Sequence, residues 1–322
     1  MADNDVRDVI MVGAGPSALA ASVYTTREDI DTVLYEKGVV GGMAAITDKV
    51  DNYPGFPEGI EGMRLAGQLQ AQAERFGAQI ELGEVSEIRD EDGLKVVVVD
   101  GKDVRAKAVL IATGSDYKKT GVPGEAEFFG RGVHYCATCD GAFYRDKRLA
   151  VIGGGNSAVQ ETIFLTRFAQ HIDLLVRSEI SASEVLQKEL DNYVKEGKVT
   201  VHLQTSTQEI VATDGKITSV RVTKEGQESS IDIDGVFVFV GLLPNTGFLK
   251  GSAIELDEYG LIKTDKSLQT SMKGVFASGD VRSGATLQIA SAVGEGATAA
   301  LSIREYLDGL HHHLGDAESP TV

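Results

Sequence analysis

The sequence predicts an α/β protein in which one strand–turn–helix module occurs twice. Residues 9–12 and 149–152 are continuous apolar runs, the composition of a buried parallel strand. Each run is followed by a glycine-rich turn and then by a helical pattern, at residues 19–27 and 159–168. The chain has 322 residues, enough for two domains with a core each, and its 42% hydrophobic content argues against disorder.

The first turn, residues 13–18, has the pattern G-x-G-x-x-A. Its glycines let the backbone approach a pyrophosphate, and the following helix supplies amide donors at its N-terminus. The next strand, residues 32–35, ends at Glu36, which is 36 − 15 = 21 residues after Gly15. A carboxylate at that distance binds ribose hydroxyls. Strand, turn, helix and acid together predict a dinucleotide-binding domain of the Rossmann type.

The second turn, residues 153–158, repeats the pattern, so a second Rossmann-like domain is predicted, with nucleotide contacts at Gly153, Gly155, Asn156 and Ser157. The position equivalent to Glu36 is 155 + 21 = 176, which is Val176. Without a carboxylate there, NADH is disfavoured, and Arg177 could meet the 2′-phosphate of NADPH. An ordinary surface arginine is an equally good interpretation of Arg177.

Cys136 and Cys139 are the two cysteines of the chain, and Asp140 follows them directly. A pair with this spacing closes a small disulfide ring that opens and recloses easily, and Asp140 could move a proton during the exchange. Two cysteines in so long a chain indicate catalysis in a reducing compartment, so a cytoplasmic protein is expected. His134 would add a third zinc ligand, but a structural zinc site needs four, and no metal site is predicted.

Charge and hydropathy exclude several classes of partner. The net charge of −17 argues against nucleic acid and against an anionic membrane surface. No apolar run reaches the length of a membrane span, and the acidic start is not that of a signal peptide.

The remaining elements follow from periodicity and from turn residues. Glycine- and proline-rich stretches at residues 115–125 and 241–246 predict domain junctions, and residues 41–56 form a long loop able to wrap a ligand. From residue 311 the tail lacks periodicity, and its three histidines are not expected to bind a metal. Helices are expected at residues 64–76 and 287–307, and strands at 79–85, 96–99, 109–114, 172–175, 199–203, 217–222, 231–240 and 274–280.

Five motifs, in this order, resemble the bacterial-type low-molecular-weight thioredoxin reductases, a family of flavoprotein disulfide reductases. They are residues 12–16, 52–56, 136–141, 153–158 and 277–280. The resemblance implies a homodimer with FAD and a fold in which the second Rossmann-like domain is inserted into the first. The FAD-binding domain would comprise residues 1–116 and 244–322, and a pyridine-nucleotide-type domain with the cysteine pair would comprise residues 117–243.

The resemblance also assigns roles to residues. Cys139 would be the thiol on the flavin side, Cys136 the thiol that attacks the disulfide of thioredoxin or a thioredoxin-like protein, and Asp140 the general acid. The implied FAD contacts are Gly13, Gly15, Pro16, Ser17, Glu36, Gly41, Gly42, Met43, Asn52, Val85, Gly114, Gly279, Asp280, Gln288 and Ile289.

The sequence departs from the family pattern where the electron donor would bind. The usual His-Arg-Arg signature, with a further arginine, is replaced by Val176-Arg177-Ser178 and Ser181. The family's glutamine after Gly-Gly is Met43, its basic residue before Gln288 is Leu287, and its histidine near residue 242 or 243 is a leucine. NADPH is therefore uncertain, and ferredoxin or reduced flavin are alternative donors. Two other interpretations remain: an FAD-dependent dithiol oxidase that uses oxygen, and a non-enzymatic nucleotide-binding module held by zinc.

Overall fold

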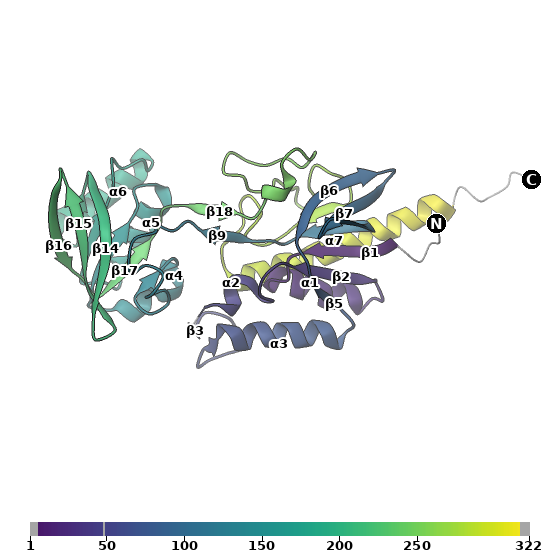
Figure 1. Ribbon diagram of the computed structural model, residues 1–322, viewed down its shortest axis with the longest axis horizontal. Helices are drawn as coiled ribbons and strands as arrows, with labels where there is room; N and C mark the ends of the chain where they lie inside the picture. Colours follow the sequence, from purple (N-terminus) through teal and green to yellow (C-terminus); the bar gives the residue numbers. More distant parts are fainter. Residues whose placement is uncertain (1–5, 48, 316–322) are drawn as a thin grey trace, which may run out of the picture. The chain divides into compact units, whose positions relative to one another are not determined.

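The computed structural model describes residues 6–47 and 49–315, and the acidic start of the chain, residues 1–5, lies outside this part (Figure 1). The chain divides into two compact units, one made of Met1–Asp116 and Leu243–Val322 and the other of Tyr117–Leu242. Both units are mixed α/β structures with a parallel sheet, which confirms the predicted fold class.

The first unit is built on a seven-stranded sheet in the order β5-β2-β1-β8-β7-β6, with β19 paired to the last part of β8. β1, β2, β5, β8 and β19 are parallel, and β6, β7 and β8 form an antiparallel meander. The strands are β1 (Val6–Val12), β2 (Thr32–Glu36), β5 (Gln79–Leu82), β6 (Val85–Glu91), β7 (Leu94–Val99), β8 (Lys102–Ile111) and β19 (Val275–Ala277).

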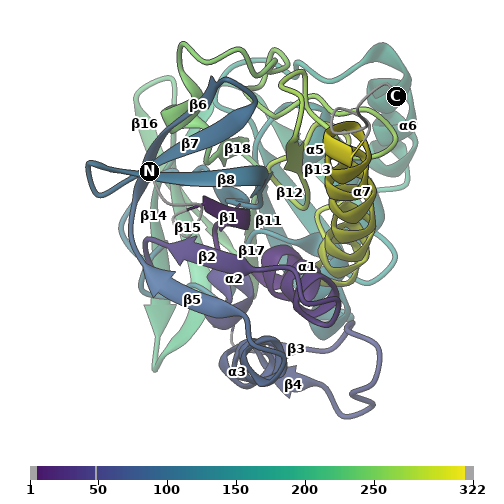
Figure 2. The ribbon, with the colours of Figure 1, turned by 90° about the vertical axis from the view of Figure 1, so that its right-hand side faces the viewer.

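Helices cover one face of this sheet, where α1 and α7 pack against each other (Figure 2). Small residues permit the close approach: a Cβ on Gly296 of α7 would lie 2.1 Å from the carbonyl oxygen of Ser17. Apolar side chains of residues 249–281 fill the core on the other face. The helices are α1 (Pro16–Thr26), α2 (Gly42–Ala45), α3 (Gly62–Arg75) and α7 (Ile289–Gly315); β3 (Lys49–Val50), β4 (Ile60–Glu61) and the 3-10 turn η3 (Gly247–Leu249) complete the unit.

The second unit has three layers. A five-stranded parallel sheet in the order β10-β17-β11-β12-β13 has helices on one face and a three-stranded antiparallel sheet, β14-β15-β16, on the other. The strands are β10 (Val133–His134), β11 (Arg148–Ile152), β12 (His171–Leu175), β13 (Val199–His202), β14 (Thr205–Thr213), β15 (Lys216–Lys224), β16 (Gln227–Asp232) and β17 (Gly235–Val238). The helices are α4 (Ala137–Asp140), η2 (Gly141–Tyr144), α5 (Asn156–Leu165) and α6 (Glu184–Lys195).

Two short strands, β9 (Ser115–Tyr117) and β18 (Leu242–Pro244), pair where the chain leaves and re-enters the first unit. Within the first unit the Asn245 amide donates to the Gly114 carbonyl at 3.0 Å. Within the second, the Lys118 amide donates to the Gly241 carbonyl, also at 3.0 Å. In each unit, a backbone hydrogen bond therefore joins the two chain segments that lead to the other unit.

Several expected elements differ from those observed. The run at residues 231–240 is divided between β16 and β17, which belong to different sheets, because the chain turns at Asp234. The run at 79–85 likewise contains a break: β5 ends at Leu82, and Val85 begins the next strand, β6. α6 and β14 were not expected.

The tail was expected to lack regular structure from residue 311, but α7 extends to Gly315, so His311–His313 lie within its backbone. Packing of Ala299, Ile303 and Leu307 in the core stabilises the helix. Extending an existing helix by a further turn costs little free energy, because the unfavourable nucleation step is already complete. Across residues 6–47 and 49–315, no helix is both long enough and apolar enough to span a membrane.

Candidate active site

The turn between β1 and α1 is shaped by two glycines with different constraints. Gly13 has φ +96°, and a Cβ there would lie 2.7 Å from the Ala112 carbonyl oxygen, so a side chain is excluded by the fold itself. Gly15 precedes the helix N-terminus, and a Cβ there would meet nothing within 4 Å. Pro16 occupies the first turn of α1. The open side of Gly15 and the free amides of the first helical turn make a cradle for an anion.

Glu36 ends β2 beside this turn. Its Oε2 accepts the Ala14 amide at 2.8 Å, and its Oε1 accepts the Gly38 amide at 2.8 Å. Both carboxylate oxygens are thus oriented by backbone, and each keeps a lone pair for a further donor. This geometry fits the predicted contact with ribose hydroxyls.

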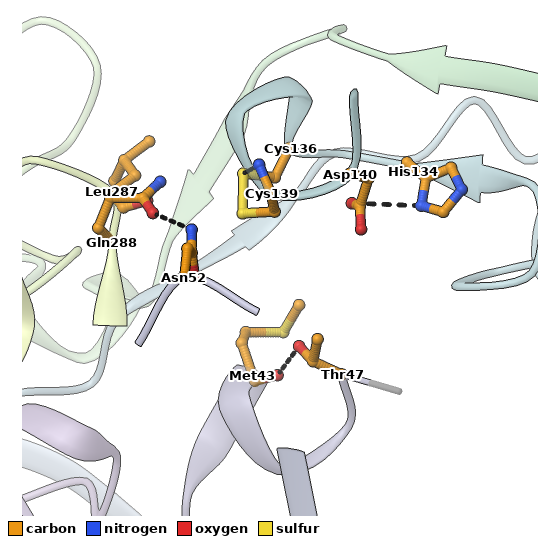
Figure 3. Close-up of a disulfide and its surroundings, with 9 residues drawn as sticks. All are labelled: Met43, Thr47, Asn52, His134, Cys136, Cys139, Asp140, Leu287 and Gln288. Carbon is orange, nitrogen blue, oxygen red and sulfur yellow. Dashed lines mark hydrogen bonds and ion pairs between the residues drawn. A yellow bond between two sulfur atoms is a disulfide. The ribbon is translucent and has the colours of Figure 1, made fainter. Parts of the chain in front are cut away.

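Gly41 and Gly42 close the other side of the cradle. The Gly41 amide donates to the Ala14 carbonyl at 2.8 Å, and a Cβ on Gly42 would lie 3.7 Å from the Gly15 Cα. Met43 follows in α2, and its carbonyl accepts the Thr47 hydroxyl at 2.9 Å (Figure 3). The structure therefore brings the first turn and the Gly41–Met43 segment together.

Asn52 and Gln288 meet although they are far apart in the sequence. The Asn52 Nδ2 donates to the Gln288 Oε1 at 3.0 Å (Figure 3). Gln288 also donates to the Leu287 carbonyl at 2.7 Å, and Ile289 begins α7. This contact joins the loop after β3 to the start of α7.

Asp280, after β19, has a carboxyl oxygen that the fold leaves without a hydrogen-bond partner among the described residues. This oxygen, Oδ1, is buried. Burial, together with the nearby Glu295, raises the pKa of this carboxyl to about 6. Its backbone is fixed, because the carbonyl accepts the Ser115 hydroxyl at 2.6 Å. A buried carboxyl oxygen without a partner fits a ligand that brings hydroxyl or N–H donors.

Residues that the sequence analysis did not single out hold this segment in place. The Ser278 hydroxyl lies 2.6 Å from the Ser17 hydroxyl, which connects β19 to α1. Glu295 of α7 accepts the Gly279 amide at 2.8 Å and pairs with Arg282. These contacts are tertiary, and no local pattern in the sequence signals them.

Two other predicted contact residues lie further along the sheet. Val85 begins β6 and is buried in one core cluster with Val12 and Tyr35, the residues that precede the first turn and Glu36. Gly114 follows β8 with φ +66°, and a Cβ there would meet nothing within 4 Å.

The cysteine pair of the second unit is a disulfide with a Cα–Cα distance of 5.3 Å. Cys136 precedes α4, and its Sγ accepts the Cys139 amide at 3.1 Å (Figure 3). A backbone amide aimed at sulfur favours the thiolate once the bond is reduced. The spacing of the pair, the amide contact and the adjacent Asp140 suit thiol–disulfide exchange.

Asp140 is part of a row of polar side chains that also contains His134 and Tyr144, joined by one ion-pair contact and one hydrogen bond. His134 Nδ1 lies 3.2 Å from Asp140 Oδ2, and His134 Nε2 lies 2.7 Å from the Tyr144 hydroxyl. The His134 side chain is 7% exposed and that of Asp140 21%. Burial raises the pKa of Tyr144, as do Asp140 and Asp234, so its hydroxyl keeps its proton. From the sequence, His134 was expected to matter only as a potential zinc ligand.

The second glycine turn repeats the local geometry of the first. Gly153 has φ +145° and donates to the Leu175 carbonyl at 3.1 Å. The segment after β12 folds back on it, since the Ser181 amide donates to the Gly154 carbonyl at 2.8 Å. Asn156 Oδ1 accepts the Ser183 amide at 2.7 Å, and Ser157 is exposed.

Val176 and Arg177 differ sharply in exposure. Val176 is 2% exposed and belongs to the core beneath α5 and α6, whereas Arg177 is exposed. Among the residues that the structure describes, Arg177 has no ion pair or side-chain hydrogen bond. A phosphate could reach it, but no second arginine accompanies it in the segment of residues 176–183.

Metal ligation has no geometric basis in the described ranges. The two sulfurs are bonded to each other, and both ring nitrogens of His134 are in contact with other side chains, Nε2 with the Tyr144 hydroxyl and Nδ1 with the Asp140 carboxylate. No group of three or more histidine, cysteine, aspartate or glutamate residues is arranged to hold a metal ion within the described part of the chain.

Known proteins of the same architecture match the chain over nearly its full length. The family model for pyridine nucleotide-disulphide oxidoreductases matches residues 7–296. The thioredoxin reductase of Bacillus subtilis is 41% identical over 318 residues, 98% of this chain and 99% of that protein. That of Listeria innocua is 40% identical over 315 residues, 97% of each chain. The crystal structure of thioredoxin reductase from Streptococcus pyogenes gives a TM-score of 0.89 at 37% identity, and the match covers 95% of this chain and 100% of that one.

Proposed function

The chain belongs to the pyridine nucleotide-disulphide oxidoreductases and, within them, to the thioredoxin reductases, and from this membership we propose that it reduces the disulfide of thioredoxin or of a thioredoxin-like protein. The family makes it a flavin-dependent disulfide reductase that uses FAD. The observation that carries the proposal is the Cys136–Cys139 disulfide, with an amide on Cys136 Sγ and the Asp140 carboxyl next in the chain.

The first unit fits FAD on three structural grounds. The cradle beside Gly15 is open, the Glu36 carboxylate is oriented by two amides, and Asp280 Oδ1 is buried without a partner. We assign the pyrophosphate to the turn of Gly13, Gly15, Pro16 and Ser17, and the adenosine ribose to Glu36. The remaining proposed contacts are Gly41, Gly42, Met43, Asn52, Val85, Gly114, Gly279, Asp280, Gln288 and Ile289. Bound FAD supplies the electron pair that opens the disulfide.

The cysteines then carry out two exchange steps. The Cys136 thiolate attacks one sulfur of the partner's disulfide, which forms a mixed disulfide and releases one partner thiolate. Asp140, as general acid, protonates that leaving thiolate. The Cys139 thiolate next attacks Cys136 Sγ, which restores the enzyme disulfide and releases the second partner thiolate. The sum is one dithiol oxidised and one disulfide reduced. This cycle suits a reducing compartment, and we place it in the cytoplasm.

NADPH is proposed to be a poor donor for this enzyme, with ferredoxin or reduced free flavin as the better one. The second glycine turn has the shape of a nucleotide site, but Val176 is packed in the core where a ribose carboxylate would be. Arg177 would hold a 2′-phosphate alone, with Ser178 and Ser181 in place of further arginines. One arginine gives one charged contact, whereas bidentate or paired arginines give the strong sites.

A homodimer is the proposed assembly. Tyr24 of α1 and Leu301 of α7 are each 41% exposed, although large apolar side chains on packed helices are normally covered. Sedimentation equilibrium of the purified flavoprotein tests this, and a single species of monomer mass at micromolar concentration contradicts it.

One anaerobic titration tests the function. The purified protein is expected to show a flavin absorption band that dithionite bleaches fully and that excess NADPH or NADH bleaches slowly. Addition of an oxidised bacterial thioredoxin should restore the band and produce free thiols. The matched control is Cys136→Ser, which should be bleached like the wild type but leave thioredoxin oxidised.

Other outcomes would contradict specific parts of the proposal. Absence of a flavin band contradicts the FAD assignment. Rapid bleaching by NADPH contradicts the alternative donor and leaves the reductase intact. Fast oxygen consumption with a small dithiol, without thioredoxin reduction, assigns the chain to the dithiol oxidases instead.

A further inference from the structure

His134 and Tyr144 form a row with Asp140 beside the disulfide, and neither of these two residues has a task in the exchange steps of the proposed function. His134 is nearly enclosed, with an aspartate on one ring nitrogen and a tyrosine hydroxyl on the other. Figure 3 draws the Asp140 carboxylate between the disulfide and the His134 ring in that view. A histidine placed next to a proposed general acid suggests a role in its action.

The protons of this row can be assigned from its surroundings. Tyr144 keeps its hydroxyl proton, because burial raises its pKa and the carboxylates of Asp140 and Asp234 add to the effect. The hydroxyl is therefore available as a donor to His134 Nε2, 2.7 Å away. When Nε2 accepts this bond, the proton of the neutral ring sits on Nδ1, which lies 3.2 Å from Asp140 Oδ2.

The ring itself is held in place by apolar packing. His134 lies with its centroid 5.2 Å from that of Phe237 and 5.3 Å from that of Tyr144, and Phe237 and Tyr144 also pack edge to face. Tyr144 in turn rests on Gly235, where a Cβ would lie 2.3 Å from its ring. Three residues of η2 and β17, Tyr144, Gly235 and Phe237, thus fix the direction of His134 Nδ1.

We propose that His134 is a positioning residue for Asp140: its Nδ1–H holds Oδ2, so that Oδ1 carries the proton to the leaving thiolate of the substrate disulfide. This rests on the proposed function of Asp140. The proton moves from Asp140 to the partner thiolate as the Cys136–partner bond forms and the partner's disulfide bond breaks. His134 neither gains nor loses a proton in this step.

The test compares two disulfides whose leaving groups differ. An aryl disulfide reagent releases a stable thiolate that needs no acid, whereas the thioredoxin disulfide releases an alkyl thiolate that does. The enzyme is first reduced with dithionite under nitrogen, so the result does not depend on the natural donor. The exchange rate is then measured with each disulfide for the wild type and for three variants.

Each variant isolates one property of the side chain. His134→Phe keeps the aromatic packing and removes the donor, His134→Asn places an amide N–H near the position of Nδ1, and Tyr144→Phe removes the hydroxyl on Nε2. His171→Phe is the matched control: this histidine of the same unit bonds to the Gly197 carbonyl and the Thr200 hydroxyl, away from the row.

His134→Phe is expected to slow exchange with thioredoxin roughly 10- to 100-fold, the effect of one hydrogen bond to a charged group, and to slow the aryl disulfide less than about threefold. His134→Asn should restore most of the exchange rate with thioredoxin. Tyr144→Phe should have a rate between those of His134→Phe and the wild type, and His171→Phe should have the wild-type rate. A His134→Phe enzyme that is as fast as the wild type with thioredoxin overturns the proposal. Equal slowing with both disulfides also overturns it, since that indicates disrupted packing.

Failure of the proposed function can be told apart from failure of this inference. If the wild type does not reduce thioredoxin, the same comparison is made with hydroxyethyl disulfide, a small alkyl disulfide. A selective effect of His134→Phe on that substrate supports the role of His134 even when the protein partner has been assigned wrongly.

Discussion

Asp280 and Asp257 are carboxyls of the same unit whose pKa values are shifted in opposite directions. Burial raises the pKa of Asp280 to about 6, with a further effect of Glu295. Asp257 is also desolvated, but hydrogen bonds from the Ser283 hydroxyl and from the Leu261 and Tyr259 amides lower its pKa overall. The opposite pKa shifts follow from hydrogen-bond donors: the fold provides donors to the Asp257 carboxylate, whereas Asp280 Oδ1 has none among the described residues.

Asp280→Asn is expected to stabilise the apoprotein and weaken FAD binding. A carboxyl with pKa 3.8 when unfolded and about 6 when folded binds more protons in the folded state, so it lowers stability as pH rises through this window. The cost approaches roughly 3 kcal/mol above the folded pKa. Urea unfolding of the apoprotein at about pH 8 should therefore favour the variant, and the difference should vanish near pH 3.5.

Asp257→Asn is the control, and it is expected to change the free energy of unfolding in the opposite direction. Its folded pKa is lowered, so its stabilising effect is present above the unfolded pKa and is lost as pH falls through the folded pKa. The variant should be less stable than the wild type near neutral pH and should bind FAD normally. If both variants shift stability in the same direction, the pKa of Asp280 is not raised.

Arg177 is expected to decide how the enzyme distinguishes NADPH from NADH. Its side chain is exposed and no neighbouring arginine supports it. Arg177→Ala should raise the NADPH concentration needed for half-maximal flavin reduction roughly tenfold, and leave that for NADH unchanged. Equal effects on both nucleotides would contradict a 2′-phosphate contact. The matched control is Arg167→Ala, an exposed arginine stacked on Phe164.

At this scale the sequence predicted residues that lie in or beside local motifs. Glu36 is predicted as a ribose ligand because it follows Gly15 at a fixed spacing, and Cys136 and Cys139 are predicted as a redox pair because they are the two cysteines. Ser278 and Glu295 could not be predicted, since the fold brings them to their partners Ser17 and Gly279. The proposed role of His134 could not be predicted either, because the side-chain contacts with Asp140 and Tyr144 follow no recognisable sequence pattern.

Among the elements, the β1–α1 turn contains two glycines with different roles: Gly13 is required by the fold, and Gly15 is proposed to be required for FAD binding. Gly13→Ala should destabilise the unit, because the residue has φ +96° and its Cβ would clash with the Ala112 carbonyl. Gly15→Ala should leave stability nearly unchanged, because its Cβ enters open space, and should abolish or greatly weaken FAD binding. Thermal unfolding of both apoproteins and flavin content after purification measure this. A Gly15→Ala protein that retains full flavin contradicts the cradle.

Strands and helices were predicted best where they are buried on both faces. The parallel strands β11 and β12 contain continuous apolar runs and were predicted to within one residue. β1 was predicted from residue 9 but begins at Val6, because its first part, which contains Arg7 and Asp8, is only half-buried and not apolar. β14 was missed because one face is solvated and its sequence, TSTQEIVAT, is largely polar. α6 did carry a signal, since Leu186, Leu190 and Tyr193 have helical spacing and face the core.

For the whole molecule, the cores of the two units are separate. Every cluster of buried apolar residues found in the described part falls within one unit: three in the first and two in the second. The glycine- and proline-rich stretches near residues 115–125 and 241–246 predicted two junctions between domains. The sequence could not show that each unit holds its own ends together, because those hydrogen bonds join residues more than 120 positions apart.

Each unit is therefore expected to fold without the other. Residues 117–242 expressed alone should form the Cys136–Cys139 disulfide and unfold cooperatively, because its ends are held by the Lys118–Gly241 hydrogen bond. The first unit, with residues 117–242 replaced by a short glycine linker, should bind FAD, since Gly114 and Asn245 already meet. Circular dichroism and flavin content measure both, with the full chain as control. A linker protein that folds without binding flavin would mean that the inserted unit completes the FAD site. An isolated second unit that stays unfolded would mean that its stability depends on the rest of the chain.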